Sequence, residues 1–373
     1  MTSHILFDVH HLYYLPQFLP VYRVLQSRGI SCEFVVYRNR ELQAVLDKAV
    51  TDEDLPVHWV DSVEDARDYY QARRASWLIL GNSFKYLDDL PAVTRTALIN
   101  HGAGVKGAGH DASMCRVTVR FAEGPYQRRQ LQKHYPQGTY VDVGFSKLDP
   151  LFSPEVLPGP NSDSKTPALN LIACGLDPAK PTLLYAPTFY PSSIECMSDR
   201  WPDEFADYNL LVKPHFFTYT KRRYKAQRRK LEIWRSANNV AIADVSDYNL
   251  LPFMAIADLL ISDASTALFE FAALNKPVVW CEFLKLRWSY RGPFRYRYAR
   301  RMDQDILRYA DIAVHARRYK DLLAHVQSEL ADPGRHQPQR QSHTRELMGV
   351  TDGQVSQRIV DYLLEGKRPD TAD

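Results

Sequence analysis

Short apolar segments alternate with amphipathic stretches along almost the whole chain, and this alternation constrains the fold more than any other feature. The apolar segments read as strands and the stretches between them as helices. In the first half, the expected strands are 4–9, 32–37, 75–82, 96–104, 114–124 and 139–145. In the second half, they are 181–189, 208–217, 240–245, 257–263 and 276–283. Strands that alternate with helices predict parallel, doubly wound sheets, whose ligands bind beyond the carboxyl ends of the strands.

Two domains are expected. Residues 153–170 interrupt the alternation, because they are rich in Pro, Ser, Asn and Asp and have little periodicity. A chain of 373 residues also exceeds one typical core. We therefore predict an α/β protein of GT-B-like architecture, in which two doubly wound parallel-sheet (Rossmann-like) domains face a cleft. The expected bounds are 1–155 and 156–345, followed by a C-terminal helix in 346–373 that packs back on the first domain.

The composition is that of a soluble globular protein with reduced thiols. Hydrophobic residues make up 45% of the chain and charged residues 24%, and the net charge of +3 requires no nucleic-acid partner. The 5 cysteines lie far apart and match neither a redox pair nor a zinc site. The N-terminus lacks the features of a signal peptide, and no apolar run approaches the ~20 residues that span a bilayer. We expect a cytoplasmic protein, with peripheral membrane contact left open.

A glycine-rich loop follows one of the expected strands. The stretch "INHGAGVKGAG" places His101 at the end of the strand and Lys106 within the loop. Glycines let the backbone approach a ligand closely, and histidine exchanges a proton near neutral pH. His101 is therefore either a general base, with Lys106 near a phosphate, or a hydrogen-bonded histidine in a loop.

The second half has a matching feature in "LLVKPHFF". Lys213 and His215 are two positions apart, so both side chains point to one side of an extended chain. Such a pair suits an anionic group, and the alternative is a surface lysine with a histidine at the edge of the core. In "LLYAPTFY", Thr188 either binds phosphate or caps the next helix.

The stretch "LISDASTALFE" predicts a turn from a strand into a helix. Asp263, Ser265 and Thr266 lie at this turn, and Asp and Ser are preferred residues for capping a helix. The start of a helix also offers free N–H groups and partial positive charge, which suit a phosphate. Capping and phosphate binding are both open from these residues alone.

Two basic stretches, 221–230 and 287–301, mix cations with aromatic residues. They suit an anionic polymer or anionic lipid headgroups, and the alternative is a solvated basic helix face. Arg291 in the second stretch is a candidate contact for an anionic substrate. The "DQD" at 303–305 resembles a metal-binding motif but falls within an apparent helix, so no metal site is expected there.

Together these motifs resemble those of the CDP-glycerol glycerophosphotransferase family, which makes teichoic acid and related capsule polymers. The resemblance begins near Asn100 and follows the family's order through "NHGAGVK", "GFSKLDPLF", "YAPTFY", "KPHF", "SDASTALFEFAALNKP" and "DGQVSQR". It implies an enzyme whose first domain faces the acceptor and whose second domain binds the nucleotide donor. The implied reaction moves glycerol phosphate, or a related polyol phosphate, from a CDP-activated donor to an acceptor hydroxyl and releases CMP.

The resemblance also implies roles for individual residues. His101 would be the general base, and His215 would act with it in catalysis. The implied donor-binding residues are Lys213, Thr188, Asp263, Ser265, Thr266 and Glu270, with Asp263 shaping the turn. Contacts to the acceptor or to phosphate would come from Lys106, Lys147 and Arg291. For Asp149, the residues themselves favour a structural role, in a turn with a Lys–Asp pair. No cofactor and no metal are implied, and the acceptor would be lipid-linked or polymeric.

Two other classes of function remain open from the sequence. The same fold could serve a nucleotide-sugar glycosyltransferase or an enzyme like UDP-sugar 2-epimerase, since both hold a diphosphate at a helix start. The chain could also be an inactive scaffold that binds lipid or polymer through its basic stretches. The nucleotide that the protein binds, or its failure to bind one, distinguishes these functions from the transfer of a polyol phosphate.

Overall fold

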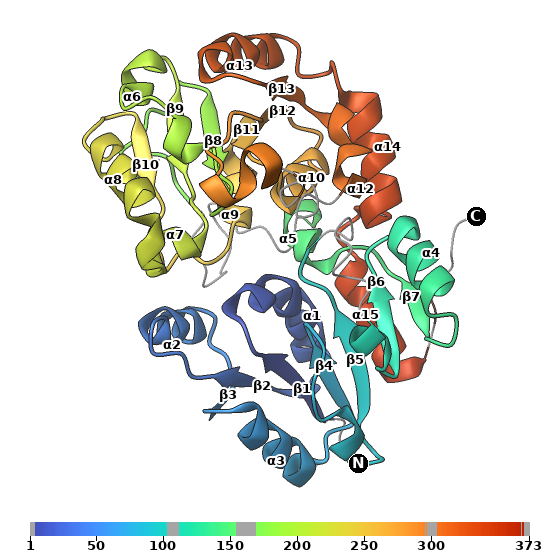
Figure 1. Ribbon diagram of the computed structural model, residues 1–373. Coiled ribbons are helices and arrows are strands. Elements are labelled where there is room, and N and C mark those ends of the chain that lie inside the picture. Colours follow the sequence, from blue (N-terminus) through green and yellow to red (C-terminus); the bar gives the residue numbers. More distant parts are fainter. Residues whose placement is uncertain are drawn as a thin grey trace. The chain divides into compact units, whose positions relative to one another are not determined.

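The computed structural model describes residues 4–102, 112–153, 169–294, 296, 304–366 and 368. The chain divides into two compact units, each built around one sheet (Figure 1). Unit 1 comprises Met1–Thr166 together with Arg345–Asp373, and unit 2 comprises Pro167–Thr344. Unit 1 is therefore made from both ends of the chain.

The sheet of unit 1 has the strand order β3-β2-β1-β4-β5-β6-β7, and each neighbouring pair is parallel. The strands are β1 (His4–Val9), β2 (Ser31–Tyr37), β3 (Val57–Val60), β4 (Trp77–Leu80), β5 (Arg95–Ile99), β6 (Val119–Ala122) and β7 (Tyr140–Asp142). The α-helices are α1 (Leu15–Ser27), α2 (Gln43–Asp52), α3 (Val63–Arg73), α4 (Pro125–His134), α5 (Asp149–Phe152) and α15 (Val355–Glu365). Short 3-10 turns include η1 (Leu12–Tyr14) and η5 (Ser146–Leu148).

The sheet of unit 2 has the order β10-β9-β8-β11-β12-β13, again with parallel neighbours. The strands are β8 (Thr182–Ala186), β9 (Asn209–Val212), β10 (Val240–Ile242), β11 (Leu259–Ser262), β12 (Val278–Cys281) and β13 (Val314–Ala316). The α-helices are α6 (Trp201–Glu204), α7 (Phe216–Thr220), α8 (Lys225–Trp234), α9 (Leu251–Ile256), α10 (Thr266–Ala272), α12 (Gln304–Leu307), α13 (Leu322–Ala331) and α14 (Gln337–Met348), the last of which runs across the unit boundary. Two 3-10 turns, η7 (Arg222–Tyr224) and η8 (Trp288–Tyr290), flank the site described below.

The inner strands of both sheets are buried on both faces, as expected for strands covered by helices. Every residue of β4, β8, β11 and β12 is buried, which explains their continuous apolar sequences. The core of unit 2 gathers large rings against this sheet, with Tyr185, Trp201 and Trp234 completely buried. The predicted doubly wound α/β fold with two parallel sheets is confirmed.

Two edge strands escaped the sequence analysis. β3 ("VHWV") and β13 ("VHA") each contain a histidine and are mostly half-buried. A sheet edge needs less apolar surface than the centre, so these short mixed segments lack the apolar run that marks a buried strand. Among the described helices, none is long and apolar enough to cross a membrane.

The C-terminal helix α15 is attached to unit 1 by a polar joint. α15 packs against α1, and the buried carboxylate of Asp149 accepts hydrogen bonds from the backbone N–H groups of Val355 (3.2 Å) and Ser356 (2.6 Å). Arg358 pairs with Asp352 just before the helix. Asp149 therefore satisfies N–H groups in the first turn of α15, which would otherwise be buried without a partner.

Replacing Asp149 by Asn should weaken this joint. The variant keeps the size of the side chain but retains one carbonyl oxygen in place of two carboxylate oxygens. We expect the free energy of unfolding, measured by urea denaturation, to fall by about 1–2 kcal/mol. Asp68→Asn, on the surface of α3, is the matched control and should change stability by less than ~0.5 kcal/mol. Equal unfolding midpoints for Asp149→Asn and wild type would contradict this role.

Candidate functional site

The candidate base lies where the chain leaves the sheet of unit 1. His101 follows β5, and the neighbouring Asn100 is buried and donates from its side-chain nitrogen to the backbone oxygen of Gly102 at 3.1 Å. The ring of His101 packs against Tyr13 and Tyr14, with centroid distances of 4.7 Å and 5.4 Å. The tight turn and the two tyrosine rings together hold the imidazole at the carboxyl edge of the sheet.

The support for His101 comes from a part of the chain that the sequence analysis left unassigned. Tyr14 is completely buried and covers Gly81, where a Cβ atom would come within 2.6 Å of the tyrosine ring. Two further ring contacts extend this cluster. His10 stacks on His11 with 4.5 Å between ring centroids, and His11 stacks on Tyr13 with 4.9 Å. The sequence feature that could have predicted this aromatic cluster is the run "HHLYY", which directly follows the first strand.

A buried acid lies next to this turn. Glu123 follows β6, the strand that pairs with β5, and its side chain is almost fully buried. Burial raises the pKa of Glu123 to about 7, and the positive charge of Arg120 opposes this rise. Glu123 thus follows the strand next to the one that leads into His101, and its protonation changes in the neutral range.

This pKa makes a pH-dependent contribution to stability. Because the folded-state pKa lies above the ordinary value of 4.5, the folded protein binds the proton more tightly than the unfolded chain does. The contribution is therefore fully present at low pH and is lost as pH rises from about 4.5 to about 7.

Glu123→Gln should remove that part of the pH dependence. The difference in free energy of unfolding between wild type and variant is expected to change by roughly 3 kcal/mol at most across this range. Urea denaturation at a series of pH values measures it. Parallel stability curves for the two proteins would show that Glu123 does not titrate in this range.

Three other residues of the first half were assigned roles from the sequence, namely Lys106, Lys147 and Asp149. Lys147 lies in η5, directly after β7, at the same edge of the sheet as His101. Lys106 lies outside the described residues. The expected structural role of Asp149 is confirmed by its bonds to α15.

In unit 2, Asp263 joins the ends of two paired strands, β11 and β8. Its buried carboxylate accepts hydrogen bonds from the backbone N–H of Thr188 at 2.9 Å and of Ser193 at 3.1 Å. It also accepts from the hydroxyl of Ser192 at 3.1 Å. Burial raises the pKa of Asp263 to about 6, and the hydrogen bonds from the loop oppose this rise. Asp263 is therefore the residue that fixes the loop 188–193 over the sheet.

The structure corrects two capping hypotheses. The hydroxyl of Thr188 donates to the backbone oxygen of Pro191 at 2.7 Å and so closes its own loop; this hydrogen bond caps no helix. Ser265 precedes α10, but its side chain makes no capping bond and contacts the hydroxyl of Ser262 at 3.2 Å. Thr266 starts α10, and Glu270 is buried one turn further along this helix.

Lys213 and His215 follow β9, which pairs with β8, so they lie at the same edge as the loop 188–193. Burial lowers the pKa of Lys213 to about 8, and Asp247 and Asp244 oppose this change. At neutral pH the amine is therefore mainly protonated. A half-buried ammonium group at the carboxyl edge of a parallel sheet is suited to binding an anion.

The hydrogen bonding of His215 identifies its tautomer. Nδ1 of His215 accepts from the backbone N–H of Phe217 at 3.2 Å, so the neutral ring carries its proton on Nε2. The ring also packs on Phe189, in the loop after β8, with 4.7 Å between centroids. Phe189, which the sequence analysis missed, thus links the position of His215 to the loop held by Asp263.

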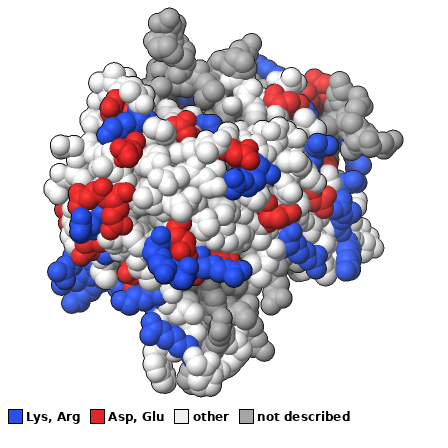
Figure 2. Space-filling view, turned by 90° about the horizontal axis from the view of Figure 1, so that it is seen from above, with Lys and Arg blue, Asp and Glu red and all other residues white. Residues whose placement is uncertain are grey.

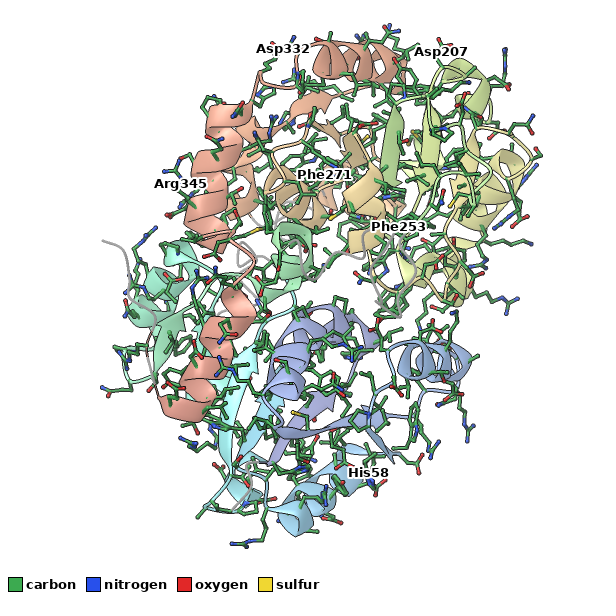
Figure 3. All side chains as sticks on the ribbon, turned by 180° about the vertical axis from the view of Figure 1, so that it is seen from behind. His58, Asp207, Phe253, Phe271, Asp332 and Arg345 are labelled. Atoms are coloured by element: carbon green, nitrogen blue, oxygen red, sulfur yellow. The ribbon has the colours of Figure 1, made fainter. Side chains whose placement is uncertain are left out.

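Figure 3 helps to place this edge within unit 2. Asp207, two residues before β9, lies at the end of the unit opposite to Phe253 of α9. The amino ends of the strands are therefore at the Asp207 end and their carboxyl ends, with Lys213 and Asp263, at the other. Arg291 is exposed after η8, and its backbone N–H donates to the oxygen of Trp288 at 3.0 Å.

Neither the face drawn in Figure 2 nor the described residues indicate a patch of one charge or a metal site. Basic and acidic side chains are interspersed on the face in Figure 2, so they do not form one large field of a single sign there. In the described ranges, no group of three or more His, Cys, Asp or Glu residues could hold a metal ion. The first aspartate of the "DQD" motif falls outside those ranges.

The sequence model of the family described as CDP-Glycerol:Poly(glycerophosphate) glycerophosphotransferase matches residues 63–365. The teichoic acid glycerol-phosphate primase of Bacillus subtilis (strain 168) is 33% identical over 114 residues, which are 30% of this chain and 29% of the primase. The chain thus matches less than a third of the primase's own length.

Solved structures share the fold over nearly the whole chain. The wall teichoic acid polymerase TagF is similar with a TM-score of 0.67 and 14% identity, over 98% of this chain and 89% of the polymerase chain. MnaA of S. aureus, solved with UDP, has a TM-score of 0.61 and 14% identity, over 98% of this chain and 99% of its own. At this identity, the likeness shows the fold alone.

Proposed function

The chain belongs to the CDP-glycerol:poly(glycerophosphate) glycerophosphotransferase family, and on this premise we propose that it transfers a polyol phosphate from a CDP-activated donor. The proposed donor is CDP-glycerol or a related CDP-polyol, and the acceptor is a hydroxyl of a lipid-linked or polymeric cell-surface precursor. The main support is the anion-binding edge of unit 2. There Lys213, His215 and the loop fixed by Asp263 follow neighbouring strands.

The proposed reaction is an in-line displacement at the donor's β-phosphorus. The acceptor oxygen forms a new bond to this phosphorus while the bond to the bridging oxygen breaks, and CMP leaves with the electron pair. His101 takes the proton of the acceptor hydroxyl. Its placement by Asn100, Tyr13 and Tyr14 supports this role, because a general base must be held in a fixed orientation.

Residues of unit 2 act on the phosphates. The protonated amine of Lys213 neutralises negative charge, and the neutral ring of His215 donates its Nε2 proton to a phosphate oxygen. Asp263 contributes by fixing the loop that carries Thr188. We assign Ser265, Thr266 and Glu270 to the donor as well, and Lys106, Lys147 and Arg291 to the acceptor or its phosphates.

Peripheral binding to the inner face of the cell membrane is part of the proposal. Several cations in and before α8 are exposed, namely Arg222, Arg223, Lys225 and Arg229. Lys and Arg side chains near an anionic membrane surface contribute about 1 kcal/mol each. A lipid-linked acceptor would place the enzyme at this surface in the cytoplasm.

The competing function is that of an enzyme acting on a UDP-sugar. Its specific support is the fold shared with MnaA, which was solved with UDP, and with a putative UDP-N-acetylglucosamine 2-epimerase of Listeria monocytogenes. These proteins have no more than 14% identity to this chain. The nucleotide preference of the purified protein separates the two functions.

Thermal unfolding of the purified full chain tests the proposed donor. CDP-glycerol, CDP-ribitol and CMP should raise the melting temperature, because a ligand at ~100 times its dissociation constant adds roughly 2.7 kcal/mol of stability. UDP and UDP-N-acetylglucosamine are the comparison ligands and should have little effect. Stabilisation by the uridine compounds alone would replace the proposed function with the competing one.

His101→Ala should lower turnover of CDP-glycerol by at least ~10²-fold, since a positioned base typically contributes ~10²–10⁴-fold. Release of CMP measures the rate, and circular dichroism checks the fold. His134→Ala, at the exposed end of α4, is the matched control and should turn over like wild type. Near-normal turnover in His101→Ala would exclude this histidine as the base.

A further inference from the structure

Arg287 is the first residue of the basic stretch 287–301, and the sequence analysis gave it no role of its own. It lies between β12 and η8, and its guanidinium carbon is 4.0 Å from the ring centroid of Tyr190 and 5.8 Å from that of Tyr224. The backbone N–H of Arg287 donates to the hydroxyl of Tyr190 at 3.0 Å. Two contacts to one tyrosine therefore hold this residue, one through its backbone and one through its charged group.

The rings beneath Arg287 are fixed. Tyr190 and Tyr224 are both buried, and Tyr190 belongs to the loop 188–193 that Asp263 and Thr188 hold in place. The centroid of Tyr224 is 6.0 Å from that of Phe189, the residue on which His215 packs. Arg287 therefore belongs to the same group of loops as His215 and Thr188.

The charge of Arg287 has no acidic counterpart in the described part of the chain. Other cations of unit 2 do have one: Lys230 pairs with Asp199, and Arg317 with Glu282. The side chain of Arg287 is also exposed. A guanidinium that stacks on an aromatic ring uses its flat face for that contact, so the N–H groups at its edge can donate to an anion.

We infer that Arg287 binds the diphosphate of a nucleoside diphosphate compound and that Tyr190 positions it for this contact. The ligand class follows from the chemistry, because guanidinium groups recognise phosphate oxygens through paired N–H donors. Arg287 is linked to His215, at the edge proposed for the phosphates, through the packed rings of Tyr224 and Phe189. The inference rests on the proposed function for the site, and it adds a donor contact to those that the motifs indicate.

Substitutions of Arg287 and Tyr190 test the inference with CDP, UDP and cytidine as probes. Dissociation constants are measured by calorimetry or by thermal shift on the full chain. Arg287→Ala should weaken binding of the diphosphate that wild type prefers by about tenfold, or ~1.4 kcal/mol. Arg287→Lys should recover part of the affinity. Cytidine has no phosphate, so its binding should be the same in all variants.

Two further variants complete the test. Tyr190→Phe keeps the ring beneath the guanidinium but removes the hydroxyl that accepts from the backbone of Arg287, so its affinity for the diphosphate should lie between those of wild type and Arg287→Ala. Arg67→Ala removes a matched stacked arginine in unit 1, which lies 4.9 Å from the ring of Tyr86 and donates to Asp68. It should bind both diphosphates as wild type does.

The outcomes separate this inference from the proposed function. If wild type binds CDP or UDP and Arg287→Ala binds it equally well, the inference is overturned and the proposed function is not. If wild type prefers UDP and Arg287→Ala loses that affinity, the diphosphate contact holds and the choice of donor is wrong. If wild type binds neither diphosphate, both fail.

Discussion

The buried carboxylate of Asp263 is the interaction on which the site of unit 2 depends. It lies at the end of β11 and accepts hydrogen bonds from the backbone of the loop after β8. It therefore ties this loop to the turn that follows β11. Phe189 on that loop supports His215, and Tyr190 supports Arg287. A buried carboxylate without such donors would be costly, which explains why the loop supplies several of them.

Much of the fold could be predicted because parallel strands covered on both faces must be apolar along their length. β4, β8, β11 and β12 all have this form. The edge strands β3 and β13 could not be found in the same way, since a sheet edge tolerates polar residues. The family was also predictable from the order of its motifs, and the match over residues 63–365 confirms it.

The site was predicted less completely, for a physical reason. Motifs indicate residues near the strand ends, and His101, Lys213 and Asp263 do lie there. The side chains that hold such residues come from elsewhere in the sequence: Arg287 meets Tyr190 across 97 positions, and Tyr13 reaches His101 from the turn η1, which follows β1. Such contacts have no local pattern, so only the folded structure reveals them.

The polar joint at Asp149 has a consequence for synthesis on the ribosome. Because α15 belongs to unit 1, the first unit cannot be completed until residues 355–365 have emerged. Unit 2 is continuous in sequence and is already available by then. The half of the chain that is translated second is therefore expected to finish folding first, while the surface of α1 that receives α15 is left uncovered during translation.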